Sequence, residues 1–160
     1  LDETPERELK QLDLCPVVQK CVERLQPAAE RAEVSLRFDG ESVSVMADTA
    51  QIEDMVENLC DNAIRYNRKG GDVIVTLKRE EDKAVLTVAD TGIGIPPEHQ
   101  NRIFERFYRV DKSRSKETGG TGLGLAIVKH IAEQHHAKLS LRSTLGEGTV
   151  IQVSFPVCKK

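Results

Sequence analysis

Residues 48–67, DTAQIEDMVENLCDNAIRYN, carry the clearest helical pattern in this chain. Asp48, followed three residues later by Gln51, is typical of the capping box that begins a helix. Apolar residues then recur at the i, i+3, i+4 and i+7 spacing of a single helical face. These residues are Ile52, Met55, Val56, Leu59, Cys60, Ala63 and Ile64. The pattern predicts an amphipathic helix that ends near Asn67, before a pair of glycines that supplies a turn.

Alternating apolar and polar residues on both sides of this helix predict strands. Two strands follow it, at 73–78 and 84–89, and the acidic turn EED joins them. Two more precede it, at 34–38 and 43–46, separated by an Asp-Gly pair. The spacing of these two is compatible either with a hairpin or with two sequential strands.

Two further helices and a closing hairpin complete the expected elements. Residues 17–31 and 123–135 show helical spacing of apolar residues. The first helix is expected to bury Val17, Val18, Cys21, Val22 and Leu25, and the second Ile127, Val128, Ile131 and Ala132. Strands at 138–143 and 149–157 are expected to form a hairpin around Gly146 and Gly148.

The order of these elements predicts the fold class. Hairpins outnumber strand-helix alternations, which favours a mixed, largely antiparallel sheet covered by helices on one face, an α/β (α+β) two-layer sandwich. We expect one domain at 12–157, with an edge strand around 12–14, a linker at 1–11 and a tail at 158–160. Residues 96–122 form a long loop, and loops of such length are usually functional lids.

Composition excludes several classes of protein. A net charge of -3 and a pI near 5.9 argue against a nucleic-acid binder, which needs a clustered basic surface. The chain has no Trp, two Tyr and four Phe, so few rings are present on which bases could stack. No apolar run approaches the length of a membrane span, and we expect a soluble segment without direct membrane contact.

Neither the cysteines nor the histidines form a metal-ligand pattern. We expect reduced, structural cysteines because no CxxC spacing occurs, and solvated helix-end histidines because no ligand stands at i+3 or i+4 of the adjacent pair. The residues concerned are Cys15, Cys21, Cys60, Cys158, His99, His130, His135 and His136.

Two glycine-rich runs are the strongest functional signals. Asp90 ends a strand and begins DTGIGIP, in which a carboxylate could accept a hydrogen bond from an exocyclic amine while glycines admit a flat ring. An ordinary turn would look the same. The second run, GGTGLGLAI at 119–127, directly precedes a helix, an arrangement that aims backbone N–H groups at phosphate. It is neither a Walker loop nor a dinucleotide fingerprint.

Two further groups of polar residues accompany the glycine runs. Asn58 and Asn62 lie four apart on one flank of the helix at 48–67, with Arg65 beyond them. They could form a solvated face or could ligate Mg²⁺ through amide oxygens. Residues 102–116, RIFERFYRVDKSRSK, add basic side chains between the two glycine runs, as a mobile lid over a triphosphate would need.

These blocks, in this order, resemble the ATP-binding and catalytic domain of sensor histidine kinases, over residues from about 12 to 157. ENLCDNAIRYN resembles the asparagine-rich box, DTGIGIP the first glycine box, RIFERFYR the phenylalanine box and GGTGLGLAIVKHI the second glycine box, with GEGT as a final short one. The resemblance implies a Bergerat-type ATPase fold, shared with gyrase-type ATPases and equipped with a mobile ATP lid.

The resemblance also implies roles for individual residues. Asn62, with Asn58, would hold Mg²⁺, and Arg109 would reach the γ-phosphate, so these three would be the catalytic residues. Asp90 would bind the adenine amino group. The other residues implied in ATP binding are Arg65, Tyr66, Gly92, Gly94, Ile95, Tyr108, Gly120, Thr121, Gly122, Leu123, Gly124, Leu125 and Thr149. Arg65 stands where many relatives have Lys, which keeps the charge but changes the donor geometry.

One position separates kinase from hydrolase within this resemblance. Gyrase-type ATPases have a Glu, the general base for water, where this chain has Asn58, and an amide cannot accept that proton. Glu57 is adjacent, but a helical step of about 100° points it elsewhere. The implied reaction is transfer of the γ-phosphate of Mg-ATP to a histidine.

The phosphoaccepting histidine of the family lies in a separate helical dimerisation domain, next to an acidic residue and Pro-Leu. No histidine here has that context, and His130 is interpreted as structural or solvent-facing. The implied partners are the dimerisation and phosphoacceptor domain of the same kinase and, indirectly, a response regulator. We expect a cytoplasmic domain of a membrane sensor. The alternatives are a nucleotide-sensing module without catalysis and an anti-sigma serine kinase.

Overall fold

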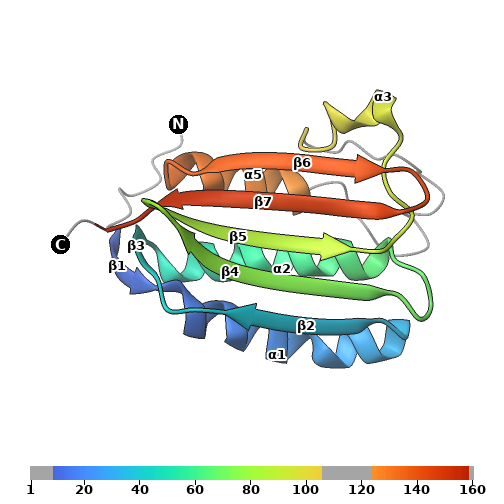
Figure 1. The fold of residues 1–160 in the computed structure, drawn as a ribbon, viewed down its shortest axis with the longest axis horizontal. Helices are drawn as coiled ribbons and strands as arrows, with labels where there is room; N and C mark the ends of the chain where they lie inside the picture. Colours follow the sequence, from blue (N-terminus) through green and yellow to red (C-terminus); the bar gives the residue numbers. More distant parts are fainter. Residues whose placement is uncertain (1–8, 106–123, 159–160) are drawn as a thin grey trace, which may run out of the picture.

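The structure, a computed structural model, describes residues 9–105 and 124–158 of the chain (Figure 1). Its helices are α1 (Leu14–Ala32), α2 (Thr49–Arg65), α3 (Pro97–Gln100) and α5 (Gly124–Gln134). Its strands are β1 (Lys10–Asp13), β2 (Ser35–Gly40), β3 (Ser44–Ala47), β4 (Asp72–Glu80), β5 (Lys83–Asp90), β6 (Lys138–Thr144) and β7 (Gly148–Pro156).

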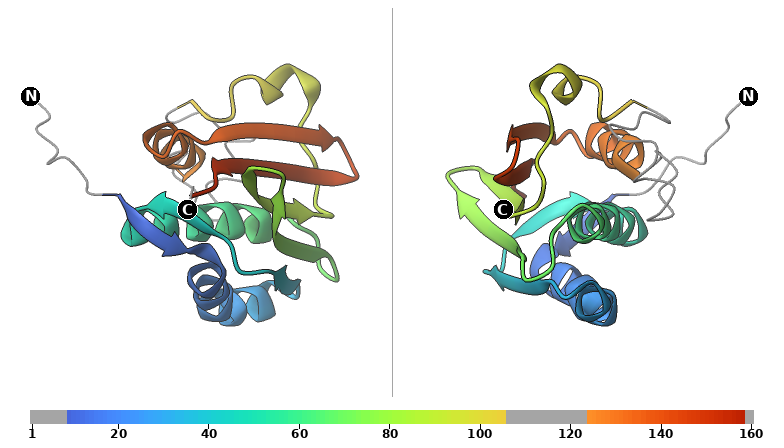
Figure 2. Two further views of the ribbon diagram at one scale, coloured as in Figure 1. Left: turned by 60° about the vertical axis from the view of Figure 1, so that its left-hand side comes forward. Right: turned by 90° about the vertical axis from the view of Figure 1, so that its right-hand side faces the viewer.

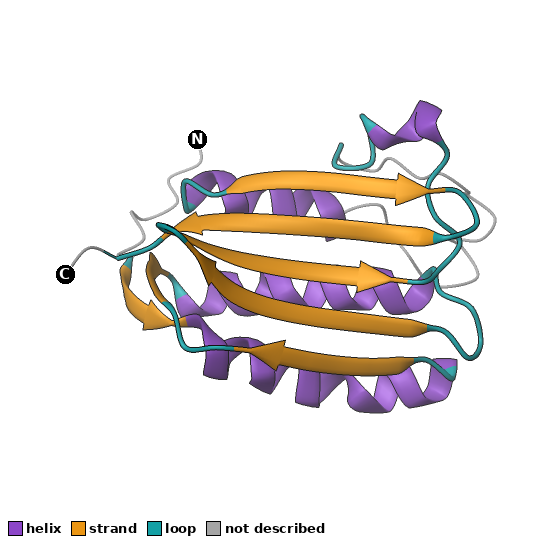
Figure 3. Ribbon diagram, in the orientation of Figure 1, coloured by secondary structure: helices purple, strands orange, loops and turns teal. Residues whose placement is uncertain are grey.

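The main sheet has five strands in the order β2-β4-β5-β7-β6. Only β2 and β4 are parallel, and the other neighbours pair in antiparallel fashion. Three helices, α1, α2 and α5, cover one face of this sheet, as the views in Figures 2 and 3 show. This arrangement confirms the predicted two-layer sandwich with a mixed, largely antiparallel sheet.

The two strands before α2 do not form a hairpin, so the second of the two predicted arrangements is the correct one. β2 pairs in parallel with β4, from Ser35 opposite Asp72 to Gly40 opposite Leu77. β3 instead pairs with β1 in a separate two-stranded sheet. The Asp39-Gly40 pair is not a tight turn because Gly40 is still within β2 and the following Glu41 N–H donates to Leu77 O, at 3.0 Å.

The predicted edge strand is present but ends one residue earlier than expected. Leu14 is the first residue of α1, because Asp13 caps that helix by accepting a hydrogen bond from the Cys15 N–H at 3.1 Å. β1 begins at Lys10, two residues before the predicted domain boundary. The boundaries at residues 12 and 157 stay predictions.

The apolar face of α2 is buried as predicted. Asp48 accepts a hydrogen bond from the Gln51 N–H at 3.1 Å, so the expected N-cap is confirmed. The seven apolar residues of the predicted stripe are each at most 5% exposed. They share one core with Val73, Val75 and Leu77 of β4 and with residues of β5 and β7. Each fully buried side chain of this kind contributes roughly 1.5–3 kcal/mol to folding.

The second predicted seam, on α5, is correct except at one position. Val128, Ile131 and Ala132 are at most 2% exposed, whereas Ile127 is 38% exposed. Successive helical residues differ by about 100°, so burial of Val128 turns its neighbour toward the edge of the contact.

His135 contradicts the prediction of a solvated histidine. Its side chain is 2% exposed, and its Nε2 accepts a hydrogen bond from the Asp48 N–H at 3.1 Å. Its Nδ1 lies 2.9 Å from Ile131 O, and its ring meets Phe155 edge-on. The reason is tertiary, since the end of α5 packs against the start of α2 and the imidazole satisfies a backbone donor there. His130 and His136 are exposed, as expected.

All four cysteines are free thiols. Cys21 and Cys60 are buried, and this burial raises the pKa of Cys21 to about 11 and that of Cys60 to about 12. Raised thiol pKa values favour the unreactive protonated form, which agrees with a structural role for these two residues.

The buried position of His135 leads to a prediction about stability. Replacing His135 with Ala should lower the free energy of unfolding by about 2–4 kcal/mol, because a cavity forms and the Asp48 N–H loses its acceptor. His130→Ala, an exposed change on the same helix, is the matched control and should stay within about 0.5 kcal/mol of the original chain. Urea denaturation measures both, and equal midpoints for the two variants would contradict the structure.

Candidate functional site

Three segments meet at one end of the main sheet, on the right-hand side of Figure 1. They are the C-terminal end of α2, the loop at residues 91–96 after β5, and the turn between β6 and β7. The Ile93 N–H donates to Tyr66 O at 3.1 Å, and the Gly146 N–H donates to Ile93 O at 2.8 Å. The loop is therefore held between the helix end and the turn.

Asp90, the last residue of β5, places a largely buried carboxylate within this group of segments. Its Oδ1 accepts a hydrogen bond from the Gly92 N–H at 2.8 Å, and the Thr149 backbone also donates to it. Burial outweighs these hydrogen bonds and raises the pKa of Asp90 to about 6. A desolvated carboxylate of this kind is a strong acceptor for an amino group that enters the site.

Gly92 and Gly94 are required by packing within the protein. A Cβ on Gly92 would overlap Tyr66 O, and a Cβ on Gly94 would overlap Thr144 O. Gly94 also has a φ of +74°, in the region that favours glycine. The two glycines thus let the loop lie directly against the end of α2 and the end of β6, whereas their predicted contact with an adenine ring stays a prediction.

A pair of hydroxyl groups fixes the far end of the loop. Ser143 Oγ accepts the Ile95 N–H at 2.8 Å and lies 2.9 Å from Thr149 Oγ1. Thr149, predicted to back the adenine pocket, is 7% exposed. Ser143 was not predicted as a site residue. The predicted hairpin could have indicated it, because Ser143 lies opposite Thr149 in the β6–β7 ladder.

Asn58 and Asn62 lie on the flank of α2 that faces α5. Asn58 donates from Nδ2 to Asp54 O at 2.7 Å, which leaves its Oδ1 as the available atom. A Cβ on Gly124 would lie 3.1 Å from that Oδ1, so the start of α5 is adjacent to it. Asn62 is partly exposed, and its side chain makes no hydrogen bond to the residues that the structure describes. Both amide oxygens can therefore accept a ligand.

Arg65 forms an ion pair on its own helix. Its Nε lies 3.0 Å from Asp61 Oδ2, and both side chains are partly exposed. Such pairs are weak, so the guanidinium can exchange this partner for another anion at little cost. Tyr66, the C-cap residue of α2, contributes its carbonyl oxygen to the loop contact described above.

Glu57 points away from Asn58, as the helical geometry predicted. Its carboxylate lies 3.0 Å from Arg24 Nη1, across the contact between α1 and α2. The carboxylate next to Asn58 in sequence is therefore held on the opposite flank of α2 from the start of α5.

The predicted residues of the lid and of most of the second glycine run lie outside the described residues. They are Tyr108, Arg109, Gly120, Thr121, Gly122 and Leu123. Gly124 and Leu125 are described, half-buried, in the first turn of α5. Of the second glycine run, the structure thus places only the helix start, beside Asn58.

Two residues that were not predicted as site residues also belong to this region. Asn67 is buried, and its side chain donates to Asp72 O at 3.0 Å and accepts from the Arg68 N–H at 2.8 Å. Arg68 donates from Nη2 to the carbonyl oxygens of Gly92 and Gly146. Asn67 ends the asparagine-rich box and Arg68 follows it, but neither periodicity nor that motif indicates these contacts, because both residues follow the helix in an irregular segment.

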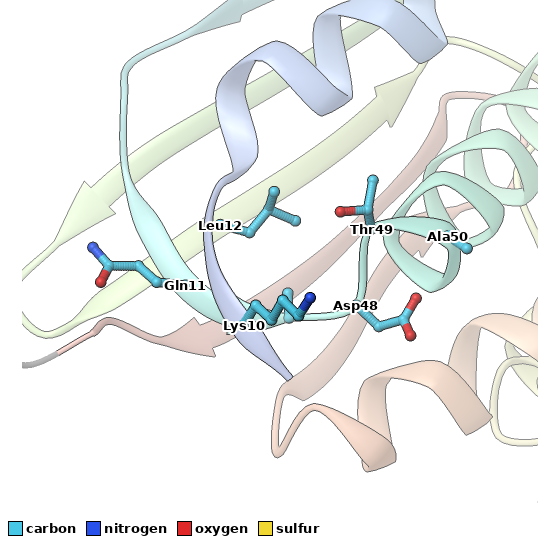
Figure 4. A pocket seen from close by; sticks show the side chains of 7 residues that line it. Lys10, Gln11, Leu12, Asp48, Thr49 and Ala50 are labelled. Atoms are coloured by element: carbon cyan, nitrogen blue, oxygen red, sulfur yellow. The ribbon is translucent and has the colours of Figure 1, made fainter. Parts of the chain in front are cut away.

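A separate hollow of about 620 Å³ lies at the other end of α2 and shares no residue with this site (Figure 4). It is lined by Lys10, Gln11, Leu12, Ala47, Asp48, Thr49 and Ala50. Residues 9–105 and 124–158 contain no group of three or more His, Cys, Asp or Glu side chains placed to bind a metal. None of the helices in these two ranges is long and apolar enough to cross a membrane.

The fold and the site define a class of nucleotide-binding protein. The sequence profile of the histidine kinase-, DNA gyrase B- and HSP90-like ATPases matches residues 47–159. The chain belongs to this ATPase family and, within it, to the ATP-binding catalytic domains of two-component sensor histidine kinases.

Individual relatives agree with this assignment. The chain is 43% identical to sensor histidine kinase RppB of Synechocystis, an alignment that covers 88% of this chain and 32% of RppB. It is 39% identical to the sensor-like histidine kinase SenX3 of Mycolicibacterium smegmatis, over 93% of this chain and 39% of SenX3. The chain thus spans about a third of the length of the curated relatives that it matches.

Solved structures show the same fold. The mycobacterial sensor histidine kinase MprB has a TM-score of 0.83 at 30% identity, over 94% of this chain and all of that chain. ShkA, solved at full length in complex with AMPPNP, has a TM-score of 0.82 at 25% identity, over 98% of this chain and 32% of that chain.

The raised pKa of Asp90 predicts how stability depends on pH. The folded chain binds the Asp90 proton more tightly than the unfolded chain, so the stability from this group is present below pH 4 and is lost as pH rises through about 6. Asp90→Asn keeps an acceptor for the Gly92 N–H without the charge. It should raise the free energy of unfolding at pH 7 by about 1–3 kcal/mol, and this gain should shrink between pH 6 and pH 4.

The control for this comparison is Asp39→Asn, which removes an exposed carboxylate on β2. Denaturant unfolding of the chain without nucleotide, measured from pH 4 to pH 8, should show no such pH-dependent gain for the control. An Asp90→Asn variant no more stable than the original chain at pH 7 would disprove the assigned cost of burying this carboxylate.

Proposed function

We propose that this domain binds Mg-ATP and donates the γ-phosphate to a histidine on a separate dimerisation and phosphoacceptor domain of the same kinase. The observation that carries this proposal is the amide at position 58, beside the start of α5, with the neighbouring carboxylate of Glu57 turned away to Arg24. In this proposal the phosphoacceptor lies in another part of the kinase, which is compatible with a chain that spans about a third of the length of its curated relatives.

Asp90 and the 91–96 loop would bind the base. The largely buried carboxylate of Asp90 would accept a hydrogen bond from the adenine amino group, and the buried Thr149 would lie behind the base. The carboxylate is charged above pH 6, which makes it an acceptor at neutral pH. The complex of ShkA with AMPPNP, an ATP analogue, supports a nucleotide as the ligand of this fold.

The start of α5 and the flank of α2 would bind the phosphates. Backbone N–H groups at the beginning of α5, including those of Gly124 and Leu125, orient the phosphate oxygens. The free amide oxygens of Asn58 and Asn62 fit Mg²⁺, which prefers neutral or anionic oxygen ligands and retains waters. When bound, Mg²⁺ neutralises charge on the phosphates. Arg109 and the other residues predicted in the lid complete the phosphate site in this proposal.

The described part of the site favours transfer over hydrolysis. A hydrolase needs a general base that accepts a proton from water close to the γ-phosphate. Asn58 cannot accept that proton, and Glu57 is engaged with Arg24 on α1. The γ-phosphate is thus preserved until an acceptor histidine docks. The product would pass to a response regulator, and the parent protein would be a membrane-bound sensor with this domain in the cytoplasm.

The experiment that tests this proposal uses γ-labelled Mg-ATP and the phosphoacceptor domain of the parent kinase. The chain should label a histidine there, with phosphate that is lost in acid and retained in alkali. Asn62→Ala should reduce labelling at least a hundredfold, because an amide ligand of Mg²⁺ is lost. Asn101→Ala, an exposed change at the end of α3, is the control and should leave labelling unchanged.

Two results would contradict the proposal. Labelling that survives Asn62→Ala would exclude the role given to that amide. Acid-stable phosphate on a serine would indicate a serine kinase instead, and nucleotide binding without any transfer to the histidine domain would indicate a nucleotide-sensing module.

A second prediction concerns the choice between transfer and hydrolysis. Asn58→Glu places a general base beside the start of α5 and should raise the release of free phosphate from Mg-ATP by about tenfold or more. Glu57→Gln is the matched control, since its carboxylate lies on the α1 side of the helix. Phosphate release that falls with Glu57→Gln, or that does not rise with Asn58→Glu, would show that position 58 does not set this choice.

A further inference from the structure

Arg68 connects the three segments around the candidate adenine site. It follows the end of α2, and its Nη2 donates to Gly92 O at 3.3 Å and also to Gly146 O. Gly92 lies in the 91–96 loop, and Gly146 lies in the turn between β6 and β7. One guanidinium nitrogen, which carries two hydrogens, therefore holds the loop and the turn to the helix end.

The backbone of Arg68 is itself fixed to the sheet. The buried amide of Asn67 accepts the Arg68 N–H at 2.8 Å and donates to Asp72 O at 3.0 Å. Asp72 is the first residue of β4, and its N–H donates to Thr91 Oγ1 at 2.9 Å. Through Asn67 and Asp72, the backbone of Arg68 is thus fixed to β4 and to the beginning of the loop.

Neutral backbone hydrogen bonds also hold the loop to its neighbours, from the Thr91 N–H to Asp72 O, from the Ile93 N–H to Tyr66 O and from the Gly146 N–H to Ile93 O. Within the loop, the Gly92 N–H donates to the carboxylate of Asp90. Hydrogen bonds from a charged donor are stronger than neutral ones, and Arg68 supplies two. If they were absent, the loop and the turn would have to be ordered when a ligand binds, and that ordering would weaken affinity.

We propose that Arg68 is a positioning residue for nucleotide binding, which holds the loop and the turn in the arrangement that accepts the adenine ring. This inference rests on the proposed function and adds to it a residue outside the predicted motifs. Arg68 acts through the carbonyl groups of Gly92 and Gly146 and makes no contact with the phosphates. Its effect on affinity is therefore the same for ADP and for ATP.

The test measures the dissociation constants of ADP and Mg-ATP by calorimetry for the 160-residue chain and its variants. Arg68→Ala should weaken binding of both nucleotides by about three- to tenfold, because two charge-assisted hydrogen bonds are lost. Arg68→Lys, which retains the charge and a donor, should recover part of that loss. Lys69→Ala is the matched control, because Lys69 pairs with Glu33, at 3.3 Å, away from the loop, and should bind like the original chain.

Two further measurements separate positioning from a general loss of structure. The melting temperature of Arg68→Ala without nucleotide should lie within about 5 °C of that of Lys69→Ala, so that both variants are fully folded in the binding assay, while amide exchange at Ile93 and Gly146 becomes faster. In the transfer assay, the KM for ATP should rise and kcat at saturating ATP should stay unchanged.

Several results would overturn the inference. If Arg68→Ala binds ADP and ATP as tightly as Lys69→Ala does, Arg68 does not position the loop for nucleotide binding. If only the affinity for ATP falls, Arg68 acts at the phosphates instead. A fall in melting temperature that accounts for the weaker binding would reduce Arg68 to a structural residue. If the unchanged chain bound neither nucleotide, the proposed function would fail first, which distinguishes that outcome from a failure of the Arg68 variants alone.

Discussion

The packing of α2 against the sheet sets the position of the candidate site residues on that helix and at its end. Its apolar face, which includes Met55 and Leu59, is buried in the core. Because side chains leave a helix at fixed angular steps, burial of this face directs Asn58 toward α5 and Glu57 toward α1. The end of the same helix meets the 91–96 loop through Tyr66 O. The packing of one helix face thus orients both flanks of α2 and the helix end that meets the candidate site.

The candidate base site combines rigid packing with an unfavourable charge. Gly92 and Gly94 fit against backbone carbonyl groups and leave no room for side chains. Asp90 is kept in the same place although burial raises its pKa to about 6, which means that the charged form is costly at neutral pH. Local arrangements that reduce stability are frequent at functional sites, where a ligand compensates for them. Adenine, with its amino donor, would provide that compensation here.

The amide of Asn58 and the carboxylate of Glu57 show how one helical step decides which side chain faces the start of α5. Asn58 and Glu57 are adjacent in sequence, yet they lie on different flanks of the helix. The ion pair with Arg24 of α1 also holds the Glu57 carboxylate on the α1 side of the helix. In the proposed function, this site binds and orients a triphosphate, and among the described residues neither Asn58 nor the paired Glu57 supplies a base beside α5 that would activate water. In this proposal, the γ-phosphate goes to a protein acceptor rather than to water, because the amide of Asn58 stands at the position where a hydrolase has its general base.

Much of the fold could be predicted from the sequence, because its main signals are local. The stripe of α2, its N-cap at Asp48 and the hairpin of β6 and β7 depend on periodicity and turn residues that lie close together in the chain. The glycine runs and the asparagine pair carried the resemblance to the ATP-binding domain of sensor histidine kinases, since they also lie in short segments of the chain. The family assignment agrees with that prediction.

The remaining features depend on contacts between segments that are distant in sequence. The partners of β2 and β3, the burial of His135 against the start of α2, and the link from Arg68 to Gly92 and Gly146 leave no pattern in the residues themselves. The sequence therefore predicted the residues that are proposed to carry the chemistry, because they belong to short motifs. The assembled structure determined which residues hold them in place, because hydrogen bonds and burial across the core depend on where separate elements meet.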